Sequence, residues 1–184
     1  MKKILTVAAF AILGLTNMHA QDVSFGVKGG INLANFAGDN SKSFDQVTAF
    51  NFGAMAEIKL SEKFSFQPEL LFSGQGTSID DATLEMRYLN LPLMAKYYAT
   101  KGLSFEAGPQ VGFLASAKME GVDVKQNFKS FDLGFNVGLG YKLQNGLNFD
   151  LRSNVGLSNI NDVKGISSKN RNSVFQASVG YFFL

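Results

Sequence analysis

The chain has 184 residues, enough for one domain, with 17 Lys and Arg residues against 15 Asp and Glu residues. It has no Cys and one His, His19, which excludes a disulfide scaffold and thiolate metal sites. Lys2 and Lys3 lie before the first predicted element. Without them the chain has as many basic as acidic residues, so it is formally neutral. That balance disfavours a nucleic-acid binder, which usually carries a basic excess.

The first predicted element is a short apolar run, 4–15, which follows the two lysines and precedes Ala20. Positive charge, a short apolar core and a small final residue are typical of a secretory signal peptide. The run is too short to cross a bilayer as a helix. We therefore predict a cleaved signal over 1–20 and a single exported domain over 21–184.

The exported part alternates between apolar and polar residues with a period of two. The pattern is clearest over 131–144, where odd positions are apolar and even positions are polar or glycine. Such a period indicates β-strands with two different faces. The same alternation recurs in seven other segments, 23–33, 50–60, 64–73, 89–98, 103–113, 147–157 and 175–183. The sequence therefore predicts eight strands.

Short and long connections alternate along the chain. The short ones are 61–63, 100–102 and 144–146, and the long ones are about 37–47, 77–83, 118–130 and 158–173. Gly102 and Gly146 occupy the third position of two short connections, where a three-residue hairpin needs a left-handed residue. All short turns and both termini should lie at one end. This is the layout of outer-membrane barrels.

The polar face is rich in glycine and carries both signs of charge, as expected of the interior of a narrow barrel whose enclosed charges pair. The turn at 100–102 places Lys96 opposite Glu106. The predicted lumen charge network contains Lys28, Glu57, Lys59, Glu69, Lys96, Glu106, Asp132, Lys142, Asp150 and Arg152. We favour a structural network over an ion path, because eight strands leave room only for side chains.

The apolar face has aromatic residues near both ends of the strands and aliphatic residues between them. This distribution is typical of barrels that span a bilayer. The predicted girdle at the tight-turn end contains Phe25, Phe64, Phe66, Tyr97, Phe105, Tyr141, Phe149, Tyr181 and Phe183. The one at the loop end contains Phe36, Phe50, Phe72, Phe113, Phe131 and Phe175. We predict an all-β, eight-stranded antiparallel up-and-down transmembrane β-barrel. The alternative is a soluble secreted barrel or sandwich with its apolar face inward.

Three segments, 25–32, 67–73 and 88–98, resemble the PorT-like outer-membrane β-barrel family of Bacteroidota. The resemblance covers the whole exported chain and implies a membrane barrel. It also suggests an accessory role in protein secretion. The end of the chain, 179–184, resembles the aromatic terminal signal read by the barrel-insertion machinery, although it closes on Leu184.

The sequence offers few residues suited to catalysis or metal binding. Without His or Cys outside the signal, Ser–His and Cys–His pairs are impossible, and we predict no enzyme, no catalytic residue, no cofactor and no metal site. Five loop carboxylates are a weak candidate for a hard cation, and we favour solvated charge: Asp39, Asp45, Asp80, Asp81 and Glu85. Lys164, Lys169 and Arg171 are a weak candidate for lipopolysaccharide phosphates.

The function predicted from these observations is display of extracellular loops by a non-enzymatic barrel in the outer membrane, for surface interaction, adhesion or envelope integrity. The alternatives are a narrow or gated channel and an accessory role in secretion. The expected partners are outer-membrane lipid and lipopolysaccharide, the insertion machinery through the C-terminal strand, and an extracellular ligand. We expect no nucleic acid.

Overall fold

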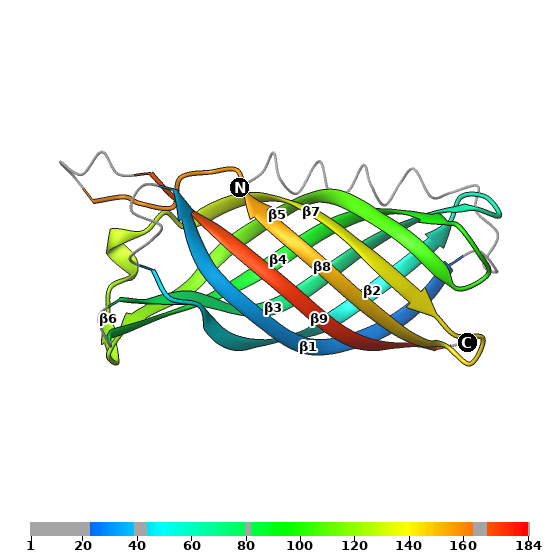
Figure 1. Ribbon diagram of the computed structural model, residues 1–184, viewed down its shortest axis with the longest axis horizontal. Coiled ribbons are helices and arrows are strands. Elements are labelled where there is room, and N and C mark those ends of the chain that lie inside the picture. Colours follow the sequence, from blue (N-terminus) through cyan, green and yellow to red (C-terminus); the bar gives the residue numbers. More distant parts are fainter. Residues whose placement is uncertain (1–22, 39–43, 80–81, 164–168, 184) are drawn as a thin grey trace.

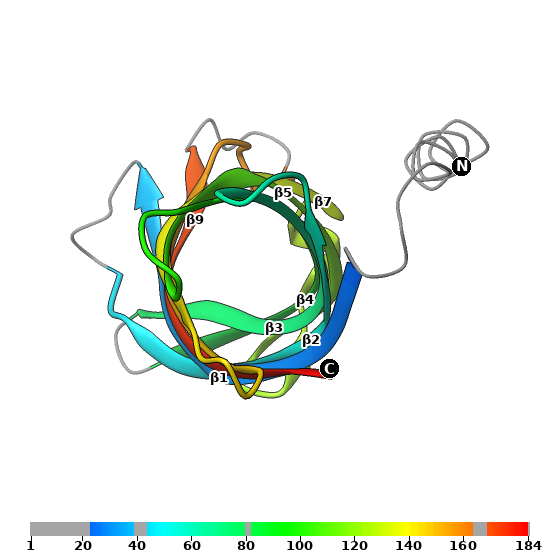
Figure 2. The ribbon, with the colours of Figure 1, turned by 90° about the vertical axis from the view of Figure 1, so that its right-hand side faces the viewer.

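Eight long antiparallel strands form a closed barrel in the computed structural model, which describes residues 23–38, 44–79, 82–163 and 169–183 (Figures 1 and 2). The strands are β1 (Val23–Gly38), β2 (Val47–Lys59), β3 (Phe64–Ile79), β4 (Ala82–Tyr98), β5 (Leu103–Met119), β7 (Phe131–Lys142), β8 (Leu147–Gly156) and β9 (Asn170–Phe183). Each pairs with its chain neighbours, and β1 pairs with β9 to close the ring. The predicted signal, 1–20, lies outside the described residues.

The predicted fold class is confirmed, and the tight turns lie where the sequence places them. The turns at 61–63, 100–102 and 144–146 join β2 to β3, β4 to β5 and β7 to β8. The register across the second turn pairs Lys96 with Glu106. Gly146 has a φ of 90°, the left-handed conformation that a side chain disfavours. The same expectation for Gly102 was wrong, because its φ is not positive.

The strands extend further toward the loop end than predicted. The expected loop at 77–83 was wrong, because β3 continues to Ile79 and β4 begins at Ala82, with these two residues paired. Likewise β5 runs to Met119 and β9 begins at Asn170, so the expected loop boundaries at 118 and 173 were also wrong. The alternation that places apolar residues on the outside ends before these extensions. The sequence pattern therefore could not predict them.

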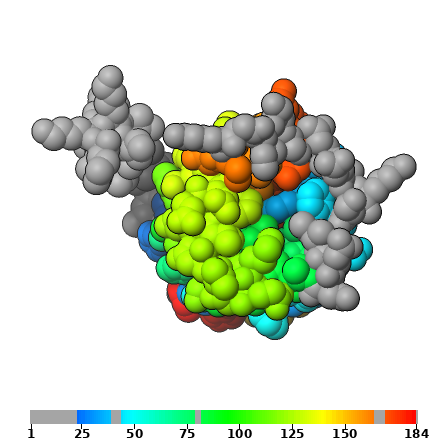
Figure 3. All heavy atoms as spheres, turned by 90° about the vertical axis from the view of Figure 1, so that its left-hand side faces the viewer, coloured from blue at the N-terminus to red at the C-terminus, as the bar shows by residue number. Residues whose placement is uncertain are grey.

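A short strand, β6 (Val122–Asp123), and a 3-10 turn, η3 (Lys125–Asn127), occupy the connection between β5 and β7. This connection is bonded to the one between β8 and β9: the amide of Lys129 donates to the carbonyl of Ile160, at 2.8 Å. Atoms of the first connection, yellow-green in Figure 3, cover much of the loop end of the barrel. That end is therefore covered by packed chain rather than by isolated strand tips.

The barrel presents apolar side chains outward and polar side chains inward over most of its height. Phe50 is 74% exposed, whereas Lys96 is 1% exposed. This is the reverse of a soluble barrel, so that alternative is excluded for this part of the molecule. Among the described residues no helix is long and apolar enough to span a bilayer.

Aromatic side chains surround the tight-turn end. Eight of the nine predicted girdle residues there are exposed, and Phe66 is half-buried. Two close pairs occur: the rings of Phe64 and Tyr97 lie 5.1 Å apart, and those of Tyr181 and Phe183 lie 6.0 Å apart. The placement of Phe36 in the loop-end girdle was wrong. This ring is 4% exposed and points into the barrel, because the inside of that end is apolar.

Candidate functional site

The lumen contains a network of eight buried or half-buried charged side chains, contributed by seven of the eight barrel strands. Four are cationic and four are anionic: Lys28, Lys96, Lys142 and Arg152 against Glu57, Glu69, Glu106 and Asp150. Inward alternation places them all on one face, and closure of the ring brings that face together. The charges cancel, as burial in a narrow space requires.

Arg152 is the centre of this network. One of its terminal nitrogens, Nη2, lies 2.8 Å from Glu69 Oε1 and 2.7 Å from Glu106 Oε2. The Nε–H of Arg152 donates to the same Glu106 oxygen at 2.9 Å. Lys96 reaches the other Glu106 oxygen at 2.9 Å, as the turn predicted, and Lys28 lies 2.6 Å from Asp150 Oδ2. Each buried ion therefore has an opposite charge within contact distance.

A second ion pair lies closer to the tight-turn end. Lys142 Nζ lies 2.7 Å from Glu57 Oε2, and the Tyr98 hydroxyl donates to the other Glu57 oxygen at 2.5 Å. The Lys142 ammonium also lies 4.0 Å from the centre of the Phe182 ring, within cation–π range. This ion pair therefore occupies the lumen between the Arg152 cluster and the tight-turn end.

Glycine on the inner face provides the space for these side chains. A Cβ at Gly140 would collide with Glu106 Oε1 and would lie 2.7 Å from the Ser104 hydroxyl and 3.2 Å from Asp150 Oδ1. A larger residue there would displace a carboxylate from its ion pairs. This explains why polar-face positions in the sequence are so often glycine.

Two members of the predicted network lie elsewhere. Lys59 is exposed at the mouth of the tight-turn end, near Glu62 and Lys101, because its strand ends there. Asp132 is 5% exposed, but its partners are neutral. It accepts hydrogen bonds from the Ser158 hydroxyl at 2.6 Å and from the Asn172 amide at 2.8 Å, near the loop end.

A layer of amides lies between the ionic cluster and the loop end, and the sequence interpretation missed it. Asn51 donates to Asn32 at 2.8 Å, and Asn32 donates to the Gly74 carbonyl at the same distance. On the far wall, Asn154 donates to Asn136 at 3.2 Å. All four amides lie at inward positions of their strands. The alternation of polar and apolar residues in the sequence could therefore have predicted this layer.

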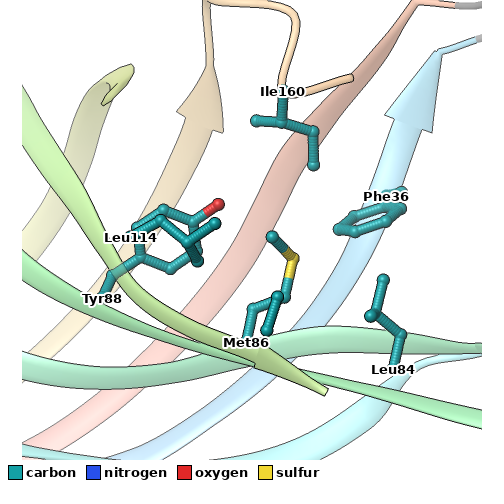
Figure 4. Packing of buried hydrophobic residues seen from close by; sticks show 7 residues of the cluster. Phe36, Leu84, Met86, Tyr88, Leu114 and Ile160 are labelled. Atoms are coloured by element: carbon teal, nitrogen blue, oxygen red, sulfur yellow. The ribbon is translucent and has the colours of Figure 1, made fainter. Parts of the chain in front are cut away.

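Beyond the amides, toward the loop end, the interior contains a cluster of apolar residues beside the buried Asp132 and Asn172. Seven buried residues pack together there: Phe36, Leu84, Met86, Tyr88, Leu114, Ala117 and Ile160. All of them except Ala117 are labelled in Figure 4. They come from β1, β4, β5 and the connection before β9. Phe44 packs its ring edge-on against Phe36, with centroids 5.6 Å apart. We call this set the apolar cap.

A β-bulge marks the change from polar to apolar interior. The register between β4 and β5 shifts from Tyr88 opposite Leu114 to Arg87 opposite Ser116, so Ala115 is the extra residue. Beyond it the buried β5 residue is Ala117, at an odd position, whereas Leu114 and the inward residues below are even. At the level of the apolar cap, the barrel therefore resembles a soluble barrel. Apolar side chains point inward there, and charged residues such as Arg87 are exposed on the outside.

The loop charges considered as binding candidates do not gather into one site. Asp39, Asp80, Asp81 and Lys164 lie outside the described residues. Glu85 lies 3.9 Å from Arg87 in an exposed ion pair, and Asp45 makes backbone bonds to Ser78. Arg171 is exposed on β9, two residues after Lys169. Among the described residues no group of three or more metal-ligating side chains is found.

Comparisons with known proteins agree with this architecture. The sequence matches the family described as outer membrane protein beta-barrel domain over residues 19–162. No curated protein shows significant sequence similarity to the chain. The match includes β1 to β8, and β9, which closes the ring, follows it.

Several solved structures share the fold at low sequence identity. Neisserial surface protein A is 14% identical with a TM-score of 0.56, covering 88% of this chain and 99% of that one. Ail, the attachment invasion locus protein of Yersinia pestis, is 10% identical with a TM-score of 0.53 at the same coverage. Its complex with the heparin analogue sucrose octasulfate gives 11% and 0.54, again covering 88% and 99%.

A major outer membrane protein of Thermus thermophilus is 14% identical with a TM-score of 0.53, covering 90% of this chain and all of that one. Every one of these solved neighbours is a small outer-membrane or bacterial surface barrel. With the family match, the outward apolar face and the ion-filled lumen, they lead to one conclusion. The chain belongs to the outer membrane protein β-barrel domain family and is a barrel of the bacterial outer membrane.

Proposed function

We propose that this protein is a closed, non-enzymatic barrel whose work is done by the surface it presents outside the membrane, in surface interaction or adhesion. The observation that carries the proposal is the reversal of interior polarity at the loop end. A transport path would need a continuous polar lumen, whereas here the ionic cluster is followed by amides and then by the apolar cap.

The strand extensions support display. β3 and β4 continue beyond Phe72 and Leu89, the last outward apolar residues of these strands, by roughly 18 Å at ~3.3 Å per residue and a tilt of ~40°. The connection between β5 and β7 covers the end of this extension and leaves Val122 and Lys129 exposed. A rigid stem that carries a packed outer surface suits recognition.

The comparisons favour the same role. The structure of Ail is described as that of an attachment invasion protein, and Ail has been solved with a heparin analogue. We extend attachment to this chain as a proposal, together with membership of the PorT-like branch that three of its strand segments resemble. The filled lumen disfavours the channel alternative. The accessory role in secretion rests on the resemblance alone, and we propose surface interaction in its place.

Attachment of whole cells tests this proposal. A non-adherent laboratory strain that expresses the protein should bind immobilised heparin or extracellular matrix several-fold better than the same strain with an empty vector. Reversing three exposed charges of the loop end, in the variant K118E/K129E/R171E, should reduce this gain to background.

The matched control reverses three exposed charges at the opposite end, in K59E/K63E/K101E, which should leave attachment unchanged. Both variants must show the heat-dependent gel mobility of a folded barrel. If wild-type cells gain no attachment to heparin, matrix or one another, surface interaction is the wrong function.

A further inference from the structure

The barrel wall has a local gap between β2 and β3. Their backbone ladder ends at Asn51 opposite Ser73, and a single bridge between Asp45 and Ser78 joins them again nearer the loop end. Between these two points no backbone pairing links the two strands in the described structure. Each strand keeps its pairing with its other neighbour, so the gap is confined to one seam.

The gap arises because β3 bends inward beneath β2. The Asn32 amide of β1 donates to the carbonyl of Gly74, at 2.8 Å, and the Thr77 hydroxyl donates to Asn35 Oδ1, at 3.2 Å. A Cβ at Gly74 would lie 2.8 Å from the Cβ of Ala49, so glycine is needed for this close crossing. In Figure 2 the ribbon of β3 runs inside the ring formed by β1 and β2.

The bend leaves a groove of about 540 Å³ at this seam. One wall carries three outward phenylalanines, Phe50, Phe52 and Phe72, and the rings of Phe52 and Phe72 stack with centroids 5.4 Å apart. The opposite wall is the end of β4, where Glu85 and Arg87 are exposed. The groove is therefore apolar on one side and charged on the other.

The groove lies at the level where the outside of the barrel changes from apolar to polar. On β2 the outward residue after Phe50, toward the loop end, is Thr48, and on β4 Leu89 is followed outward by Arg87. In an outer-membrane barrel this level is the boundary between acyl chains and head groups of the outer leaflet. An occupant of the groove thus needs an apolar part and a polar part.

We propose that the groove binds one lipid of the outer leaflet that carries a phosphate monoester, as phosphatidic acid does and phosphatidylcholine does not, with an acyl chain along the three phenylalanines and the phosphate at Arg87. The Arg87 side chain is 70% exposed, and its ion pair with Glu85 is long, at 3.9 Å, so the guanidinium can donate two hydrogen bonds to one phosphate. Lipid ester and phosphate oxygens could also accept hydrogen bonds from backbone N–H groups along the stretch where β2 and β3 do not pair, which hydrocarbon alone would leave unsatisfied.

A strand added by a partner protein is less well matched to the seam. The unpaired stretch of β2 is only Val47–Phe50, and the bridge from Asp45 to Ser78 closes it at the outer end. An added strand would have to end within a few residues, whereas a flexible acyl chain fits a short groove that opens sideways into the bilayer. The lipid proposal depends on the membrane location and not on surface interaction, so either can fail without the other.

Fluorescence quenching by brominated lipids tests the proposal, because the chain has no Trp. The variant F50W places one reporter in the groove, and F131W places one on β7, across the barrel, as a matched control. Both are refolded into bilayers that contain dibrominated phosphatidic acid or dibrominated phosphatidylcholine. We expect phosphatidic acid to quench F50W at a mole fraction about three- to tenfold lower than phosphatidylcholine does.

The control F131W should be quenched equally by the two lipids. In the F50W background, R87Q should remove the preference and E85Q should strengthen it, because Glu85 repels a phosphate. Equal quenching of F50W by both lipids, or a preference that survives R87Q, would overturn the proposal. A preference shown equally by F131W would do the same, because it would mean general attraction to the barrel.

Discussion

The charge network depends most on a single residue, Arg152. Its guanidinium contacts Glu69 and Glu106 directly and lies 3.7 Å from Asp150, and its side chain is 1% exposed. Removing a buried cation leaves its carboxylates unpaired in a low-dielectric space, which costs more than the intact ion pairs contribute. The stability of the barrel should therefore be more sensitive at this position than at any exposed lysine.

We predict that Arg152→Met, which keeps most of the side-chain length, lowers the free energy of unfolding by about 3–5 kcal/mol. The measurement is urea-induced unfolding in lipid vesicles, followed by gel mobility of unboiled samples. The control Lys59→Met, at the exposed mouth, should change it by less than about 0.5 kcal/mol. Adding Glu69→Gln to Arg152→Met should recover part of the loss, because Lys28, the other partner of Glu69, keeps its ion pair with Asp150. Equal midpoints for the two single variants would contradict this account.

The strands β4 and β5 each consist of two parts with opposite polarity. In the membrane part their inward side chains are polar, and toward the loop end their inward side chains belong to the apolar cap. The cap is stabilised by burial of apolar groups from water, whereas the membrane part is stabilised by closed backbone hydrogen bonding in lipid. The two parts should therefore respond differently to the same kind of substitution.

We predict that Ile160→Asn, at a position 0% exposed, loosens the cap and leaves the membrane barrel folded. The local cost should be about 2–4 kcal/mol, from lost packing and an unpaired amide. Hydrogen exchange should become faster over 114–130, while 103–110 stay protected. Val122→Asn, at a position 65% exposed, is the control and should change neither segment. Faster exchange throughout the barrel would show that the two parts are not independent.

The sequence predicted the strands that have one pattern throughout, β7 and β8, close to their observed bounds. It could not predict the ends of β3 and β4, because the outward apolar signal disappears where the strands leave the bilayer. Local turn geometry was sufficient to pair Lys96 with Glu106. It was not sufficient for Lys28 and Asp150, which are 122 residues apart and meet only after β9 pairs with both of their strands and closes the ring.

The whole molecule is a barrel filled along its length by three successive layers, ionic, amide and apolar. The ionic and apolar layers are made by side chains from different walls, such as Arg152 with Glu69 and Phe36 with Leu84. Eight strands enclose a space that side chains can fill, and these layers fill it. The layers also cross-link the walls, so the barrel should behave as a rigid body.

We therefore predict that pure refolded protein gives no steady conductance in planar bilayers, because ions would have to cross the buried charge network and then the apolar cap. A general porin reconstituted in the same bilayers provides the positive control. Insertion should be verified by the difference in gel migration between unboiled and boiled samples. Reproducible step openings from the wild-type protein would disprove a sealed lumen and revive the channel alternative.

The seam between β1 and β9 places Phe25 beside Phe183, the first and last parts of the described chain. A chain whose β9 has not yet been exported therefore has two open edges and no stable way to reside in lipid. Closure of the barrel must wait until β9 has been exported. Until then the chain needs a holding chaperone to keep its phenylalanine-rich faces from aggregating in water.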